Sequence, residues 1–145
     1  MKIWSRVMLV LALVALVGGT LIACGGGGSS TSSPEETVRS FLNATKSGDC
    51  SSMAKLCADQ VFDDMGMGKD EFIDFCKEGW EEVEYTRISD LEIDVEDISQ
   101  DEATVVATYH YEEKMKDVDE PDEYDHVATF YLVKEDGKWL IAEFY

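Results

Sequence analysis

The chain has few cations, few histidines and few prolines. Its 145 residues include 12 lysines and arginines against 31 aspartates and glutamates, with two histidines and two prolines. The shortage of positive charge argues against nucleic acid as a partner, because nucleic-acid binding requires a basic surface. It also argues against flat docking on anionic lipid, since like charges repel within about 8–10 Å. The acidic excess fits solubility, a cationic partner or weak divalent-cation binding.

Recognisable catalytic and metal-binding motifs are also missing. The sequence contains no Ser-His-Asp order, no phosphate-binding glycine loop and no zinc signature. Its cysteines form no CxxC pair and have no histidine nearby, which argues against a thiolate metal site. We therefore expect no cofactor and no resident metal ion.

The one long apolar run lies at the N-terminus, over residues 7–17, after Lys2 and Arg6. This layout is typical of a secretory signal, and the run is too short to cross about 30 Å of hydrocarbon comfortably. The segment Leu21-Ile22-Ala23-Cys24 resembles a bacterial lipobox, in which the cysteine is lipidated and becomes the first mature residue. The resemblance implies a signal peptide over residues 1–23, a lipid anchor on Cys24 and an extracytoplasmic place in the cell envelope. An ordinary signal or anchor helix with an incidental cysteine is the alternative.

A glycine- and serine-rich stretch, GGGGSSTSS, follows Cys24. Such a sequence cannot bury side chains, so residues 24–33 form a flexible tether with a reach of about 15–18 Å. Residues 34–145 remain as one domain with a modest core. Removal of Lys2 and Arg6 with the signal leaves a formal charge of −21 on the mature chain.

Three cysteines remain in the domain: Cys50, Cys57 and Cys76. If Cys50 and Cys57 share one helix, they lie roughly 10.5 Å apart, at about 1.5 Å per residue, too far to bond. A disulfide would then involve Cys76, and a bridge is permitted outside the cytoplasm. We favour Cys57–Cys76, with Cys50–Cys76 second and three buried thiols as the alternative to any bridge.

Helical periodicity occupies the first part of the domain. Ser33 and Glu36 form a capping box for a helix that stops at Gly48. Asp49 caps a second helix, and a third follows a turn over residues 63–69. The inward apolar positions of the three helices are Phe41, Leu42, Met53, Leu56, Cys57, Phe72, Ile73, Cys76 and Trp80.

After Trp80 the hydrophobic period changes from 3.6 to 2, which predicts strands. We expect them at residues 83–95, 103–111, 126–134 and 139–145, with a β-bulge near Ser89-Asp90 in the first. Residues 112–125 carry eight carboxylates and no glycine, and are expected to form a solvated loop rather than a calcium site. The fold class is therefore α+β, with three N-terminal helices packed on a curved four-stranded antiparallel sheet, a half-open cone.

Two stretches carry a family resemblance: PEETV through Gly48-Asp49, and VKEDGKWLI at residues 133–141. The layout resembles the nuclear-transport-factor-two-like (cystatin-like cone) superfamily, and most of all its small bacterial lipoproteins of unassigned function. The superfamily includes isomerases, dehydratases, hydrolases and binding modules, so the resemblance implies a fold and leaves the function open.

Candidate site residues lie on the predicted inner surface of the cone. We expect a pocket formed by Phe41, Trp80, Tyr109, Tyr111 and Phe130. If the hairpin around the acidic loop, residues 112–125, centres near Val118, His110 and His126 face each other across the ladder. They are then a candidate acid/base or metal pair, or a half-exposed polar pair. A one-residue slip in this register would reverse their faces.

These features favour a lipid-anchored envelope protein whose domain binds a small apolar ligand or an envelope protein without turnover. One alternative is an isomerase- or dehydratase-type enzyme that uses His110 or a tyrosine. Another is a module that self-associates through Val127, Tyr131 and Val133, because sheet-to-sheet dimers are common in the superfamily that the chain resembles.

Overall fold

The computed structural model describes residues 33–145, and the predicted signal peptide, Cys24 and most of the tether lie outside that range. The helices are α2 (Pro34–Ser47), α3 (Cys50–Lys55), α4 (Asp59–Met65) and α5 (Lys69–Glu81). The strands are β1 (Val83–Ile98), β2 (Glu102–Met115), β3 (Asp122–Glu135) and β4 (Lys138–Phe144). No helix in this range is long and apolar enough to cross a bilayer.

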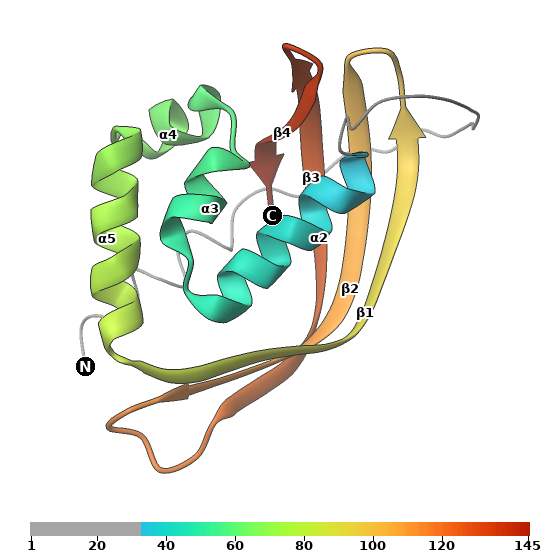
Figure 1. The fold of residues 1–145 in the computed structure, drawn as a ribbon. Helices are drawn as coiled ribbons and strands as arrows, with labels where there is room; N and C mark the ends of the chain where they lie inside the picture. Colours follow the sequence, from blue (N-terminus) through green and yellow to red (C-terminus); the bar gives the residue numbers. More distant parts are fainter. Residues whose placement is uncertain (1–32) are drawn as a thin grey trace.

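The strands form one antiparallel sheet in the order β1-β2-β3-β4. All the described helices lie on one side of it, and α2 runs across its inner face (Figure 1). The part of the sheet that holds the start of β1 and the β2–β3 hairpin bends beneath the helices (Figure 1). The predicted α+β cone, with N-terminal helices packed on a four-stranded antiparallel sheet, is confirmed.

Helix α2 begins and ends where its sequence predicts. The Ser33 hydroxyl accepts from the Glu36 backbone N–H at 3.1 Å, and the Glu36 carboxylate accepts from the Ser33 N–H at 3.0 Å. Gly48 ends the helix with φ +67°, and a Cβ at this position would lie 2.8 Å from Cδ2 of Trp80. Only glycine fits both the left-handed backbone and the neighbouring indole.

The predicted second helix is two short helices, α3 and α4. Between them Cys57 forms a parallel bridge with Ile141 of β4. The Ile141 N–H donates to the Leu56 carbonyl, and the Ala58 N–H donates to the Ile141 carbonyl, both at 2.8 Å. The helix is interrupted here because β4 forms hydrogen bonds with the backbone groups that a continuous helix would pair internally.

The disulfide joins Cys50 to Cys76, with a Cα–Cα distance of 5.8 Å, so the favoured Cys57–Cys76 pairing is wrong. Cys57 is a free thiol buried in the core beside β4. Burial raises the pKa of that thiol to about 12, which keeps it protonated. The inference that any bridge involves Cys76 is correct, but its partner was chosen wrongly: Cys50 lies in α3, which packs on α5, whereas Cys57 lies past the end of α3 and against β4.

The β-bulge predicted near Ser89-Asp90 is confirmed. The β1–β2 register shifts between Ser89 and Glu92, and Asp90 has φ +52°. The expected acidic loop over residues 112–125 is wrong, because β2 and β3 continue through most of it and leave only residues 116–121 between them. Cross-strand contacts hold this extension, including the Tyr85 hydroxyl that donates to Glu112 at 2.5 Å and the Tyr111–Tyr124 ring pair.

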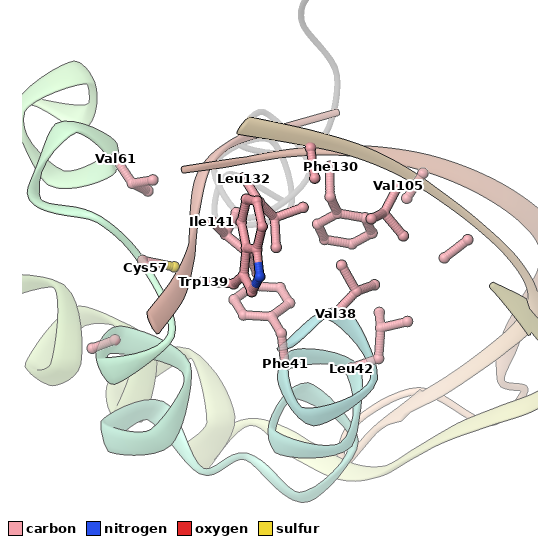
Figure 2. Close-up of a cluster of buried hydrophobic side chains, with 14 of the residues drawn as sticks. Val38, Phe41, Leu42, Cys57, Val61, Val105, Phe130, Leu132, Trp139 and Ile141 are labelled. Carbon is pink, nitrogen blue, oxygen red and sulfur yellow. The ribbon is translucent and has the colours of Figure 1, made fainter. Parts of the chain in front are cut away.

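The core fills the space between α2 and the sheet. Figure 2 shows Val38, Phe41 and Leu42 of α2 facing the strand residues, with Cys57 and Val61 toward the other helices. The strand members at the centre of this cluster are Val105, Phe130, Leu132, Trp139 and Ile141. Burial of such side chains stabilises the fold by about 1.5–3 kcal/mol each.

Candidate functional site

The inner face of the β2–β3 hairpin carries a row of aromatic and small side chains. Cross-strand partners there are Tyr111 with Tyr124, Tyr109 with His126, and Ala107 with Ala128. Partners in an antiparallel ladder share a face. The inner surface therefore changes from bulky rings to two alanines within one pair of strands.

A cavity of about 60 Å³ lies between α2 and this inner face. Ala128 has the smallest side chain among the lining residues, and it faces the cavity between larger aromatic groups. The lining consists of Phe41, Leu42, Thr45, Tyr109, Tyr111, Tyr124, His126, Ala128, Phe130, Phe144 and Tyr145.

His126 is the one basic side chain of this lining. Its Nε2 atom is buried and has no hydrogen-bond partner within residues 33–145. The rings of Tyr109 and Tyr124 contact the imidazole edge-on, with centroids 5.3 and 5.9 Å away. Burial lowers the pKa of His126 below its usual 6.5, so the imidazole is neutral near pH 7. The cavity thus contains an unsatisfied polar atom in an aromatic setting.

The two central tyrosines of the lining remain protonated. Burial is the main cause that raises the pKa of both Tyr109 and Tyr111 far above 10. The Tyr111 hydroxyl donates to the Glu113 carboxylate at 2.7 Å, which raises its pKa further. These phenols can donate hydrogen bonds and pack against a ligand, but they do not supply a phenolate base near neutral pH.

The profile of the SnoaL-like domain family matches residues 35–144, nearly all of the described chain. The protein belongs to the SnoaL-like domain family. The resemblance to nuclear-transport-factor-two-like proteins is thereby supported at the level of the fold and the domain family. No curated protein sequence matches the chain.

Solved structures with the same fold include several enzyme-like proteins. A candidate aromatic ring hydroxylase from Novosphingobium aromaticivorans aligns with TM-score 0.63 and 12% identity, covering 75% of this chain and 81% of that one. A ketosteroid isomerase-like protein from Erwinia carotovora atroseptica aligns with TM-score 0.58 and 19% identity, covering 76% and 88%. At these identities the likeness establishes the fold alone.

The expected histidine pair does not exist in this SnoaL-like domain. The β2–β3 register places His110 opposite Asp125, one residue away from the predicted pairing, so the two histidines lie on opposite faces. On the outer face, His110 Nδ1 lies 2.9 Å from Oδ1 of Asp125, and this contact raises the His110 pKa. Within residues 33–145 no group of three potential ligands could hold a metal ion.

Four of the five expected pocket residues, Phe41, Tyr109, Tyr111 and Phe130, line the cavity together. Trp80 does not, because its indole packs against Gly48 at the end of α2. Sequence reasoning missed Tyr124, which lies in the segment taken for a loop. The period-2 pattern of Tyr124, His126 and Ala128 is the signal that could have placed it on the inner face.

A larger hollow of about 500 Å³ lies on the solvent side of α2 and α3, but it is wide open. Its lining is mostly serine, asparagine and charged side chains, and it includes Ser40, Asn43 and Lys55. Enclosed, largely apolar spaces with few polar groups are the usual ligand sites. The smaller cavity at His126 is therefore the better candidate.

Proposed function

We propose that this domain binds a small, largely apolar molecule in the cone, with His126 accepting a hydrogen bond from a hydroxyl of the ligand. The observation that carries the proposal is the buried Nε2 of His126, which lacks a partner among the described residues. Leaving such an atom unsatisfied costs about 1–3 kcal/mol, and a ligand hydroxyl would remove that cost. The surrounding rings supply apolar contact area for the rest of the ligand.

The size of the cavity limits the ligand. A space of about 60 Å³ is well below the roughly 300–1,000 Å³ of common small-molecule pockets and the roughly 150 Å³ of a cavity that binds benzene. A phenol-sized ligand therefore requires the lining rings to rotate outward. We take phenol as the probe, since it combines one aromatic ring with one hydroxyl donor.

The test is a titration of the purified protein with phenol and with toluene, which lacks the hydroxyl. We expect phenol to bind, and His126→Phe to lower the affinity for phenol about tenfold while leaving the affinity for toluene nearly unchanged. Ala128→Val, which fills the cavity, should lower the affinity for both ligands. Equal phenol binding by the parent protein and by both variants would place the ligand elsewhere and refute the proposal.

An enzyme of the isomerase or dehydratase type is the second candidate. The neutral imidazole of His126 supports it, because a general base must be unprotonated at the working pH. His110 is no longer a candidate for this role, because it lies on the outer face. Against catalysis, the cavity lining in the described chain includes no carboxylate to orient the imidazole. If a substrate of the protein is found, a turnover rate that falls in His126→Gln but not in His110→Gln would favour an enzymatic function.

Anchoring of the domain by a lipid on Cys24 is also proposed. It is supported by the lipobox-like residues 21–24, the apolar run before them and the glycine-rich stretch after them. Labelling of cells with a radioactive fatty acid should mark the parent protein and leave the Cys24→Ser variant unlabelled and released from membranes. Labelling of that variant would contradict the anchor.

Self-association through the outer face of the sheet is a third candidate. Val127 on β3 is 62% exposed there, while Tyr131 and Val133 on the same face are partly buried. Sedimentation of the purified protein should then show a dimer that Val127→Asp dissociates. A monomer at high concentration removes this candidate.

A further inference from the structure

Strand β1 forms an open edge of the sheet. It is 16 residues long and pairs with β2 along one side, and no other described strand pairs with its second side. Figure 1 shows the second half of β1 at the outer margin of the sheet. An edge strand presents unpaired backbone N–H and carbonyl groups that can accept a further strand.

The inner face of this edge is apolar and incompletely covered. Ile93 and Val95 pair with Ala107 and Val105, and Ile98 pairs with Ala103, so all three lie on the core face. Val105 is fully buried, whereas Val95 and Ile98 remain 42% and 40% exposed. The apolar surface of the core thus continues to the margin of the sheet, where residues 33–145 cover it only in part.

The other side chains of the same stretch are acidic. Glu92 and Asp94 pair with Thr108 and Val106 on the outer face, and Glu96 and Asp97 follow. All four carboxylates are exposed, and none forms a salt bridge within the described chain. No lysine or arginine occurs between Arg87 and Lys114, so this edge carries negative charge alone.

We propose that residues 92–98 of β1 bind an extended basic segment of another polypeptide, which adds to the sheet as a fifth strand. Its alternate side chains would be apolar, covering Val95 and Ile98, and cationic, pairing with Glu92 and Asp94. Strand addition takes affinity from backbone hydrogen bonds and specificity from the alternating side chains. The occupant is not a second copy of this edge, because two such edges would place their carboxylates against one another. The inference is independent of the cavity at His126.

The probe is a synthetic peptide of about ten residues that alternates lysine and valine, a length typical of a strand. Its matched control has the same sequence with alternate backbone amides methylated, which keeps the charge and removes hydrogen-bond donors. Binding to the full chain is followed by calorimetry and by hydrogen exchange of the β1 amides. We expect the parent peptide to bind and to protect amides within residues 92–98, and the methylated peptide to bind at least about tenfold more weakly.

Two protein variants separate the edge from general charge attraction. Asp94→Asn with Asp97→Asn removes two charges at the edge, and Asp117→Asn with Asp119→Asn removes two in the β2–β3 turn. The two substitutions at the edge should lower the affinity for the peptide about tenfold, and the two in the turn should lower it less than about twofold. Equal effects of the two pairs, equal binding of the methylated peptide, or protection outside β1 would each overturn the proposal.

Discussion

The imidazole of His126 lies directly across the β2–β3 ladder from the phenol ring of Tyr109, with ring centroids 5.3 Å apart and planes inclined at 62°. This edge-to-face contact is an arrangement that aromatic rings favour. It holds the imidazole in the aromatic row without giving its Nε2 a partner. The same register places His110 on the solvent side of the sheet. The pKa of His126 is therefore lowered by burial, whereas the pKa of His110 is raised by its contact with Asp125.

Acid should destabilise the domain through His126. Burial lowers its pKa in the folded state below the value of 6.5, so the unfolded chain binds a proton more readily. Well above pH 6.5 the imidazole is neutral in both the folded and the unfolded chain, and the residue contributes no pH dependence. As the pH falls through 6.5, the free energy of unfolding should decrease. Urea denaturation from about pH 8 to about pH 5 should show this decrease, and His126→Gln should reduce it.

His110 provides the control of opposite sign. The hydrogen bond with Asp125 raises its folded-state pKa. Its stabilising contribution is present below the unfolded value and is lost as the pH rises through the folded value. His110→Gln should therefore steepen the acid loss that His126 causes. A shallower acid loss in His110→Gln would contradict this assignment.

Replacing His126 by phenylalanine should stabilise the protein while it removes the proposed hydrogen-bond acceptor for a ligand. The change keeps an aromatic ring beside Tyr109 and deletes the unsatisfied Nε2. We expect the free energy of unfolding at pH 7 to rise by about 1–2 kcal/mol, as measured by urea denaturation. His110→Phe removes a contact with Asp125 and should give no such gain. A loss of stability in His126→Phe would mean that Nε2 has a partner.

The Cys50–Cys76 bridge should contribute strongly to stability. Helix α5 has no fully buried residue, so the covalent link is a principal attachment of that helix to α3. Closing a loop of 26 residues predicts a loss of about 3–4 kcal/mol in Cys50→Ala with Cys76→Ala. Denaturation with and without reductant checks it. Cys57→Ala should lose less, about 1–2 kcal/mol, and should stay sensitive to reductant; insensitivity would indicate a different pairing.

Gly48 should tolerate alanine less well than Gly66 does. Both glycines end helices, with φ +67° and +68°, but a Cβ at Gly66 meets no atom within 4 Å. Gly66→Ala should therefore cost about 1–2 kcal/mol from backbone conformation alone. Gly48→Ala should cost about 1–3 kcal/mol more, from overpacking against Trp80. In a double-mutant cycle, Trp80→Ala should recover that excess; equal costs at both glycines would show that the indole moves aside freely.

The architecture was predictable because the signals for it are local. Ser33, Glu36 and Gly48 set the limits of α2 through short-range capping, and the period-2 pattern identified the sheet and its bulge at Asp90. The helix break at Cys57 was not predictable in this way. It depends on backbone hydrogen bonds with Ile141, which lies 84 positions further along the sequence.

The candidate site was harder to predict, because it depends on register. Phe41, Tyr109 and Phe130 followed from periodicity within their own elements. The positions of His110 and His126 depended on how β2 meets β3, and a difference of one residue moved His110 out of the cone. Tyr124 was missed because the many carboxylates around it predicted a solvated loop. The alternation of Tyr124, His126 and Ala128 at every second position is instead typical of a strand.

If the domain binds a ligand as proposed, Ala128 offers a simple route to new ligands. Every other residue around the cavity has a larger side chain, and Ala128 lies on a strand that is paired on both sides, so a change of side chain here alters the space without altering the sheet. Single-nucleotide changes convert an alanine codon to glycine or to valine, which would widen or close the space while β3 keeps its pairing. Under the proposed function, descendants of one such gene would diverge in the ligand that they bind through one position, before any change in fold.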